Sequence, residues 1–267
     1  MPKQFSDRHS TQVSYFALIL SGGRAARMNG IEKGLALFSG QPMIAYVIDA
    51  VKNAQHIAIS CNRESQTYNS LLDDKLSHQH KNLEPILADL PSCFADQMFA
   101  DKSGPMAGVL SYFLNWRALV ENTPIEAEST ELELQKLMEL PVVVISSDMA
   151  LMNNLTLSEL IEQWHQSQQT CLIAQSGNRD HYLPFIVKLA DGIRLAGKMK
   201  DRLESHRPQA KKDQNISHRD FSIRNWLANL NVQKVTTGQG LESKRFRSAN
   251  TTEELKNMER EALKLEK

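Results

Sequence analysis

Short apolar runs alternate along the chain with longer stretches in which apolar residues recur at helical spacing, and this alternation restricts the fold strongly. The short runs predict strands over Phe16–Leu20, Ile57–Cys61, Leu83–Leu87, Val142–Ser146, Cys171–Gln175 and Leu183–Leu189. The longer stretches predict helices over Pro42–Asn53, Glu64–Leu72, Pro105–Val120, Leu157–Gln168, Phe221–Leu230 and Thr252–Leu263. Short strands separated by helices indicate a parallel sheet that is covered on both faces. We therefore predict an α/β fold with a Rossmann-like, doubly wound, mostly parallel sheet in a three-layer α/β/α arrangement.

The length and charge of the chain bear on its domains and partners. A chain of 267 residues can bury a large core, and we expect a single domain over residues 14–267 after a disordered tail over residues 1–13. The formal net charge is zero, which favours neither nucleic acid nor a membrane surface as a partner. No apolar run approaches the roughly 20 residues that a membrane span requires. The polar first residues do not predict a signal peptide.

The cysteines and two polar segments bear on the cellular setting and on the surface of the protein. Cys61, Cys93 and Cys171 are widely spaced and form no C-x-x-C motif, so they support neither a disulfide framework nor a zinc site. A reducing, cytoplasmic setting fits this pattern. Residues 121–140 are acidic and predict a solvated helix or loop. Residues 205–220 are polar without an apolar period, and we interpret them as a mobile connection or a segment that closes over an anionic ligand.

The first predicted strand, Phe16–Leu20, runs directly into a segment suited to anions. Gly22 and Gly23 follow it, and glycines allow the main chain to approach a ligand closely. Backbone N–H groups in such a turn can hold a phosphate, and nearby cations such as Arg27 and Lys33 neutralise a polyphosphate. An ordinary strand and loop with a solvated basic rim remains the alternative. The segment matches neither G-x-G-x-x-G nor G-x-x-x-x-G-K-[ST], so dinucleotide-binding and P-loop interpretations lack support.

This segment carries a resemblance to a known family. The residues 20–34, L-S-G-G-R-A-A-R-M-N-G-I-E-K-G, resemble the L-A-G-G-x-x-x-R-M-G-G-x-D-K-G signature of the molybdenum cofactor guanylyltransferases. That family belongs to a wider set of nucleotidyltransferases that share an L-x-G-G-x-G-x-R-M-x-x-x-x-K loop. Arg27 and Lys33, the charges that matter to a triphosphate, are in place. The positions that depart from the usual pattern are Ser21, Ala25, Asn29 and Glu32.

A carboxylate ends the predicted strand V-V-V-I-S-S-D, residues 142–148. Asp148 at the tip of a buried strand is either a cap for the next segment or a Mg²⁺ ligand. In nucleotide chemistry Mg²⁺ takes one or two carboxylates and completes its shell with substrate phosphates. The strand resembles the C-D-T-P-like run of the family, and Asp148 falls on its acid. Met149 and Ala150 replace the Thr-Pro pair of that run.

Two further segments resemble family motifs on the nucleotide side. Residues 104–108, G-P-M-A-G, resemble G-P-L-A-G, a loop that opens a helix, and a helix start such as Gly104 offers free N–H groups. The family has an acid shortly before this loop. We assign it to Asp89, directly after the predicted strand Leu83–Leu87, although an insertion over residues 90–102 leaves Asp96 and Asp101 as rivals.

Asn62 and the C-terminal half carry weaker matches. Asn62 lies in a strand end resembling N-A-N-R, where its amide would either read a guanine edge or satisfy a local turn. His181 lies in R-D-H, which resembles R-D-H-P, and would either meet an acceptor phosphate or pack. Asn250 matches the second Asn of F-x-N-x-N-T-P-E-E-L, a motif that lies on the pterin side in relatives.

The resemblance implies a Mg²⁺-dependent transfer of GMP from GTP to molybdopterin, with release of pyrophosphate and formation of molybdopterin guanine dinucleotide. It implies catalytic roles for Arg27, Lys33 and Asp148, with Asp148 as the metal ligand. Transient contacts with molybdopterin-supplying proteins and molybdoenzymes follow from the same resemblance. The alternatives are a nucleotidyltransferase that uses CTP or a sugar-phosphate acceptor, and a degenerate nucleotide-binding relative. The residues that would bind nucleotide are Leu20, Ser21, Gly22, Gly23, Lys33, Asn62, Asp89, Gly104 and Asp148.

Overall fold

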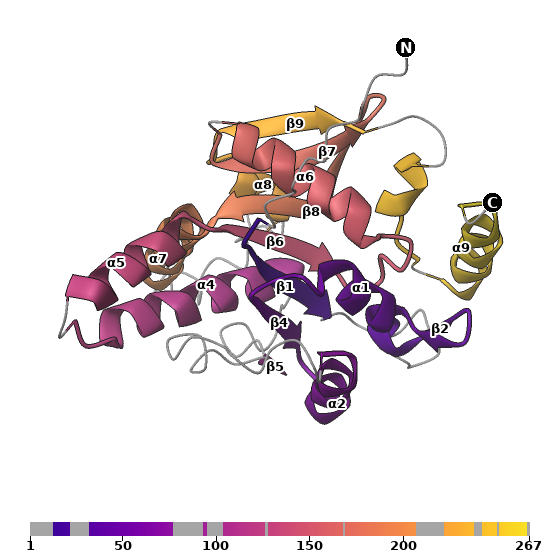
Figure 1. The fold of residues 1–267 in the computed structure, drawn as a ribbon, viewed down its shortest axis with the longest axis horizontal. Helices are drawn as coiled ribbons and strands as arrows, with labels where there is room; N and C mark the ends of the chain where they lie inside the picture. The colour runs from indigo at the N-terminus through magenta and orange to yellow at the C-terminus, as the bar shows by residue number, and fades with distance from the viewer. Residues whose placement is uncertain are drawn as a thin grey trace, which may run out of the picture.

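A computed structural model describes residues 13–21, 32–76, 93–94, 104–125, 128–167, 169–206, 222–237, 242–249 and 251–265. These residues form a seven-stranded sheet in the order β5-β4-β1-β6-β8-β7-β9, which runs from β9 at the top of Figure 1 to β5 at the bottom. The strands are β1 (Phe16–Ser21), β4 (His56–Cys61), β5 (Cys93–Phe94), β6 (Pro141–Ser146), β7 (Cys171–Ser176), β8 (Arg179–Lys188) and β9 (Val232–Thr236). A small hairpin joins β2 (Leu37–Phe38) to β3 (Gln41–Pro42).

The sheet is mostly parallel, as predicted. β1 pairs in parallel with β4 on one side and with β6 on the other, so it lies at the centre of the parallel half. β8 is antiparallel to both β6 and β7. The reason is the turn at Gly177 and Asn178, with Gly177 at φ 57°, which joins β7 to β8 by two residues. A connection this short allows only a hairpin, because parallel neighbours need a long crossover.

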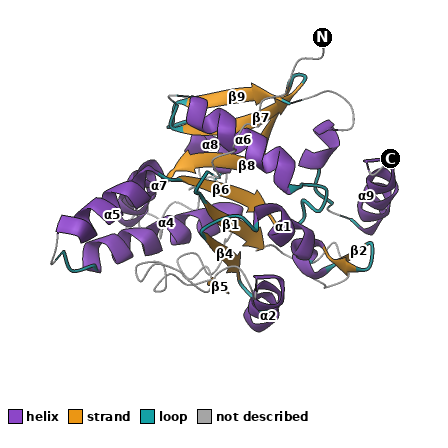
Figure 2. Cartoon of the chain, viewed as in Figure 1, coloured by secondary structure: helices purple, strands orange, loops and turns teal. Residues whose placement is uncertain are grey.

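Helices cover both faces of the sheet, which gives the three layers expected from the sequence (Figure 2). In β1, Ala17 and Ile19 face one core, whereas Phe16, Leu18 and Leu20 face the other. On the first face pack α1 (Met43–Val51), α2 (Ser65–Leu76) and α6 (Asn154–Gln166). On the second face pack α4 (Pro105–Asn122), α5 (Glu128–Glu139), α7 (Leu189–His206) and α8 (Ile223–Leu227).

Several elements differ from the sequence prediction. The predicted strand Leu183–Leu189 is the second half of the longer β8, and α7 follows it without a loop. β9 and the two-residue β5 were not predicted, and the helix expected over Phe221–Leu230 is only the short α8. The acidic segment contains the helix α5, which buries only a narrow apolar stripe. The predicted strand Leu83–Leu87 and the expected N-terminal tail up to residue 12 lie outside the described residues.

The last helix, α9 (Thr252–Leu265), closes a third, smaller core beside the hairpin β2–β3. It begins at Thr252, as predicted. The Thr251 hydroxyl caps this start by accepting a hydrogen bond from the backbone N–H of Glu254 at 3.1 Å. Leu255 and Met258 of this helix are buried in that core. Among the described helices, none combines the length and the apolar character that crossing a bilayer requires.

Candidate active site

The site forms where two neighbouring parallel strands end. β1 and β6 are paired through Leu20 and Ser146, and the backbone N–H of Ser147 continues the contact by donating to the Leu20 carbonyl at 3.0 Å. Asp148 follows β6 by two residues, and Lys33 begins the 3₁₀ turn η2 (Lys33–Leu35). Ligands of doubly wound sheets bind beyond the carboxyl ends of the strands, which is the edge where both side chains lie.

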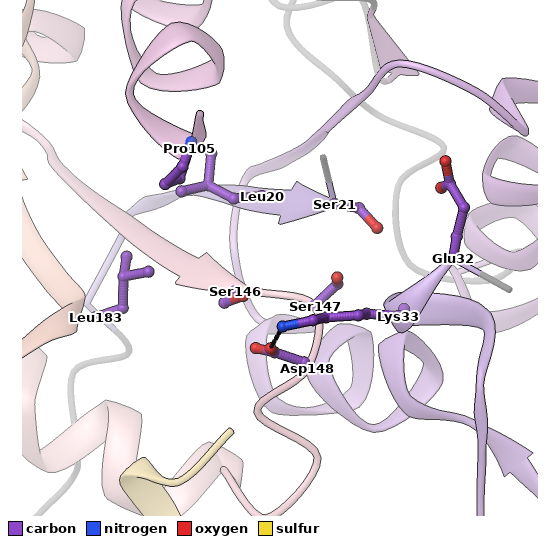
Figure 3. A pocket seen from close by; sticks show the side chains of 10 residues that line it. Leu20, Ser21, Glu32, Lys33, Pro105, Ser146, Ser147, Asp148 and Leu183 are labelled. Atoms are coloured by element: carbon purple, nitrogen blue, oxygen red, sulfur yellow. Dashed lines mark hydrogen bonds and ion pairs between the residues drawn. The ribbon is translucent and has the colours of Figure 1, made fainter. Parts of the chain in front are cut away.

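Lys33 and Asp148 meet across this edge. The Lys33 ammonium lies 3.4 Å from Oδ2 of Asp148, and the carboxylate is buried while the lysine side chain is about one third exposed. Figure 3 shows the ammonium reaching over to the carboxylate. The other oxygen of Asp148, Oδ1, is buried and has no hydrogen-bond partner among the described atoms. A buried carboxylate oxygen without a partner is costly, so this atom is poised to receive a ligand.

A pocket of about 200 Å³ opens at this pair. Its lining comes from the end of β1, from η2, from the segment that ends β6, from the start of α4 and from β8 (Figure 3). The lining residues are Leu20, Ser21, Glu32, Lys33, Gly34, Pro105, Ser146, Ser147, Asp148 and Leu183.

Gly34 lets η2 lie directly against the ends of both strands. A Cβ atom at Gly34 would lie 2.7 Å from the Ser21 hydroxyl oxygen and 2.9 Å from that of Ser147. The absence of a side chain at Gly34 therefore allows the turn that carries Lys33 to reach the carboxyl edge. The glycine that ends the family-like segment has a packing role here.

A buried hydrogen-bonded chain supports the same wall of the pocket. The Ser21 hydroxyl donates to the Tyr68 hydroxyl at 2.7 Å, and the Tyr68 hydroxyl donates to Oε2 of Glu32 at 2.8 Å. Arg63 lies with Nε 3.2 Å from Oε1 of the same carboxylate. Burial, more than any other influence, raises the pKa of Tyr68 well above its ordinary value, so its hydroxyl keeps its proton. Tyr68 is fully buried in α2.

The structure brings several of the predicted residues together. Leu20, Ser21, Lys33 and Asp148 line the same pocket, and Gly104 immediately precedes Pro105 of its lining at the start of α4. Asn62 follows Cys61, which pairs with Ser21, so it lies at the same edge of the sheet without lining the pocket. Gly22, Gly23, Arg27 and Asp89, with the rivals Asp96 and Asp101, lie outside the described residues.

Sequence reasoning missed several pocket residues. Ser146 and Ser147 directly precede Asp148, and their small size at a strand end was the available signal. Glu32 was noted only as a departure from the family signature. Leu183 was assigned to a strand, and no local pattern places it beside a pocket formed by β1 and β6.

His181 packs in the structure. It is 8% exposed, its Nε2 lies 2.6 Å from the Ser176 hydroxyl, and its ring contacts Phe246 with centroids 5.0 Å apart. Burial, followed by the positive charge of Arg179, lowers the pKa of His181 from its ordinary value. Of the two interpretations that the sequence left open, these contacts support packing. Asn250 lies outside the described residues.

The donor set at Asp148 suits a hard divalent cation. Among the described residues no group of three or more His, Cys, Asp or Glu side chains gathers as a complete metal site. Mg²⁺ at nucleotide sites needs no such cage, because substrate phosphates and water supply most of its oxygens. One buried carboxylate with an unpartnered oxygen therefore fits an ion that arrives with a triphosphate.

The fold and the site together define a class. A doubly wound sheet with a pocket and a facing lysine and carboxylate beyond two adjacent parallel strands defines an α/β protein whose ligand site lies at the carboxyl ends of the strands. The family described as MobA-like NTP transferase domain matches residues 17–212. The chain belongs to this family, and the resemblance noted in the first loop is confirmed.

Individual relatives agree with the family. A molybdenum cofactor guanylyltransferase of Neisseria meningitidis serogroup C is 54% identical over 54 residues, which cover 20% of this chain and 28% of the relative. The enzyme of the same name from Pseudomonas entomophila is 32% identical over 99 residues, 35% of this chain and 40% of the relative. The chain thus spans less than half the length of these two relatives. A third, from Shewanella putrefaciens, is 27% identical over 172 residues, 64% of this chain and 74% of the relative.

Solved structures share the fold. Molybdopterin-guanine dinucleotide biosynthesis protein A from Archaeoglobus fulgidus superposes with a TM-score of 0.54 at 19% identity, over 93% of this chain and 99% of that one. A 4-diphosphocytidyl-2C-methyl-D-erythritol synthase from Anaerococcus prevotii gives 0.55 at 9% identity, over 96% and 97%. These likenesses concern the fold, and the predicted α/β architecture is confirmed.

Proposed function

We propose that the protein transfers GMP from GTP to the terminal phosphate of molybdopterin, releasing pyrophosphate and forming molybdopterin guanine dinucleotide. The observation that carries the proposal is the Lys33 ammonium 3.4 Å from the buried Asp148 carboxylate, at the edge where the family-like first loop begins. A cation beside a metal-binding acid is the pairing that a nucleoside triphosphate and its Mg²⁺ require. The names of the relatives support the choice of GTP and molybdopterin.

The reaction is an in-line displacement at the α-phosphorus. An oxygen of the acceptor phosphate forms the new bond to phosphorus, and the bond to the oxygen that bridges the α- and β-phosphates breaks, so pyrophosphate leaves with that oxygen. The acceptor phosphate is already an anion, so no residue has to act as a strong base. The chain therefore contributes mainly by holding two anions in line and by neutralising charge.

Lys33 and Asp148 have different roles in this reaction. The Lys33 ammonium binds the phosphate oxygens on which negative charge gathers as pyrophosphate leaves. Asp148 would hold Mg²⁺ through its carboxylate, and the ion would neutralise charge on the triphosphate. The two side chains also pair with each other, which holds both of them at the site. Leu20 and Ser21 lie at the start of the loop whose backbone would cradle the phosphates.

The test removes each charge singly. Lys33→Ala and Asp148→Asn should each lower kcat/KM by a factor on the order of 10²–10³, because loss of one such group removes about 3–4 kcal/mol of transition-state stabilisation. Pyrophosphate release from GTP in the presence of molybdopterin is the assay, and thermal unfolding checks that each variant folds. Near-full activity in either variant would refute the assignment.

Control variants for both substitutions come from the region where β6 begins, at the opposite end of that strand from Asp148. Lys188 ends β8 and pairs with Glu139 at 2.6 Å, and Asp191 pairs with Arg194 at 2.6 Å. Lys188→Ala and Asp191→Asn remove the same side-chain types from exposed pairs of this kind, which contribute about 0–1 kcal/mol to stability. Both should turn over at the wild-type rate.

The identity of the nucleotide base needs its own measurement. Thermal shifts with GTP, CTP, ATP and UTP, each with Mg²⁺, should show stabilisation by GTP alone. Stabilisation by CTP in place of GTP would make the protein a cytidylyltransferase. No shift with any triphosphate, together with no pyrophosphate release, would identify a degenerate relative.

A further inference from the structure

Tyr68 joins two residues that lie far apart in the loop region but next to each other in space. Ser21 ends β1, and Glu32 immediately precedes η2, so both residues belong to the family-like segment. The Tyr68 hydroxyl lies 2.7 Å from the Ser21 hydroxyl and 2.8 Å from Oε2 of Glu32. Both Ser21 and Glu32 line the pocket, while Tyr68 lies behind them, fully buried in α2.

The direction of the hydrogen bonds shows what each group can still do. Ser21 has one hydroxyl hydrogen and donates it to Tyr68, so its side chain has none left for a phosphate. Tyr68 in turn donates its own hydrogen to the Glu32 carboxylate. The Ser21 side chain therefore faces inward as an anchor, and its contribution to an anionic ligand comes from the main chain.

The charge of Glu32 explains why this anchor matters for binding. Glu32 is 8% exposed and lines a pocket that is suited to a polyphosphate, next in the chain to Lys33. A carboxylate there repels the ligand, and less strongly when its oxygens are held by hydrogen-bond donors or cations of the protein. Tyr68 occupies one oxygen, and Arg63, whose side chain is 57% exposed, lies beside the other. Of these two partners only the tyrosine hydroxyl is shielded from water, so its hydrogen bond stabilises the position of Glu32 more than the exposed ion pair does.

We infer that Tyr68 is a positioning residue: its hydroxyl fixes Ser21 and Glu32 so that the pocket wall carrying Lys33 is preorganised for the triphosphate. The inference rests on the proposed function, because it takes a nucleoside triphosphate as the ligand. Without the hydroxyl, Ser21 loses its acceptor, and Arg63 is the partner that Glu32 keeps among the described residues. The Glu32 carboxylate then competes with the triphosphate for Lys33, and nucleotide binding weakens in the ground state and the transition state alike.

The experiment compares Tyr68→Phe with Tyr15→Phe. Both substitutions remove a hydroxyl from a buried tyrosine of the same core and keep the ring. Tyr15 directly precedes β1, at the end of the strand opposite to the pocket, and its hydroxyl donates to the Val51 carbonyl at 3.3 Å. Tyr68→Phe should raise the KM for GTP about tenfold and leave kcat within about twofold. Tyr15→Phe should lower the melting temperature and leave KM unchanged.

Coupling to Ser21 provides a second readout. If the Ser21 hydroxyl acts through Tyr68, the double variant Ser21→Ala/Tyr68→Phe should raise KM no more than the larger of the two single changes. Additive effects in the double variant would overturn the inference. So would a Tyr68→Phe enzyme whose KM equals that of Tyr15→Phe while both melt at lower temperature, since that pattern describes a purely structural hydroxyl.

Amide hydrogen exchange without nucleotide separates this inference from the proposed function. Peptides that contain Ser21 and Glu32 should exchange faster in Tyr68→Phe than in the wild type or in Tyr15→Phe. Faster exchange in a protein whose wild type neither binds nor turns over GTP would support the anchor and refute the transferase. Unchanged exchange and unchanged KM in an active enzyme would refute the anchor and leave the transferase standing.

Discussion

Gly34→Ala tests whether the turn that carries Lys33 really lies against both strand ends. A Cβ atom at this position would come within 2.7 Å of the Ser21 hydroxyl oxygen, 2.9 Å of the Ser147 hydroxyl oxygen and 3.0 Å of the Ser147 Cβ. Contacts this close do not persist in folded proteins, so either the serines or the turn has to move. The serine side chains are short and cannot swing away as a lysine could.

The expected loss of stability and turnover in Gly34→Ala follows from the displacement of the turn or of the two serines. Overpacking at a tight site costs about 1–3 kcal/mol. For a chain of this size that lowers Tm by roughly 2–4 °C per kcal/mol, or about 2–12 °C in all. Because Gly34 directly follows Lys33, a displaced turn also moves the ammonium away from Asp148. A misplacement of about 1 Å can reduce turnover by a factor on the order of 10².

The experiment measures both Tm and kcat/KM of Gly34→Ala. Two further variants serve for comparison. Gly197→Ala places a Cβ in α7 close only to the end of the flexible Arg117 side chain, so it should fold at least as stably as the wild type and keep full activity. Ser21→Ala removes the nearest clashing atom, so adding it to Gly34→Ala should cost less than adding it to the wild type. Wild-type Tm and turnover in Gly34→Ala would refute the close approach on which the geometry of the site rests.

The remaining predictions concern pH and metal. The depressed pKa of His181 means that the folded state favours the neutral ring, so stability is fully present above the unfolded pKa of about 6.5 and falls as the pH drops through the lower folded value. The urea midpoint should decrease between about pH 7.5 and pH 5.5, and the decrease should be smaller in His181→Gln; an identical decrease would contradict this origin. Removal of divalent cations with EDTA should abolish pyrophosphate release, and added Mg²⁺ should restore it. Full turnover in EDTA would show that Asp148 does not act through a metal.

The sequence was informative where local pattern and topology act together. The strands ending at Ser21 and Ser146 are fully apolar runs, and a doubly wound sheet places the carboxyl ends of its parallel strands at one edge. Those two facts place the ends of β1 and β6 side by side. Lys33 and Asp148, to which the resemblance gave roles in one site, lie 3.4 Å apart although they are 115 positions apart in the chain.

The features that sequence did not predict depend on contacts without a local signature. Tyr68 looks like one more apolar position of an amphipathic helix, and only its position behind β1 reveals what its hydroxyl touches. Glu32 was an unexplained departure from the Asp of the family signature until the carboxylate was seen with Tyr68 and Arg63 as partners. Leu183 reaches the pocket because β8 turns back beside β6, and the length of the preceding turn, not the apolar run itself, sets that direction.

The third core explains how two side chains on separate loops keep one geometry. Ala36 follows Lys33 by three residues and Ala150 follows Asp148 by two, and both are buried in the cluster that α9 closes with Leu255 and Met258. A shift of either loop would have to open this cluster, which costs apolar burial of about 25 cal/mol per Å² exposed. The Lys33–Asp148 pair is thus held by a helix more than 100 residues further along the chain from Asp148. Lys33 and Asp148 carry the opposite charges of the site, and the C-terminal helix contributes to its rigidity.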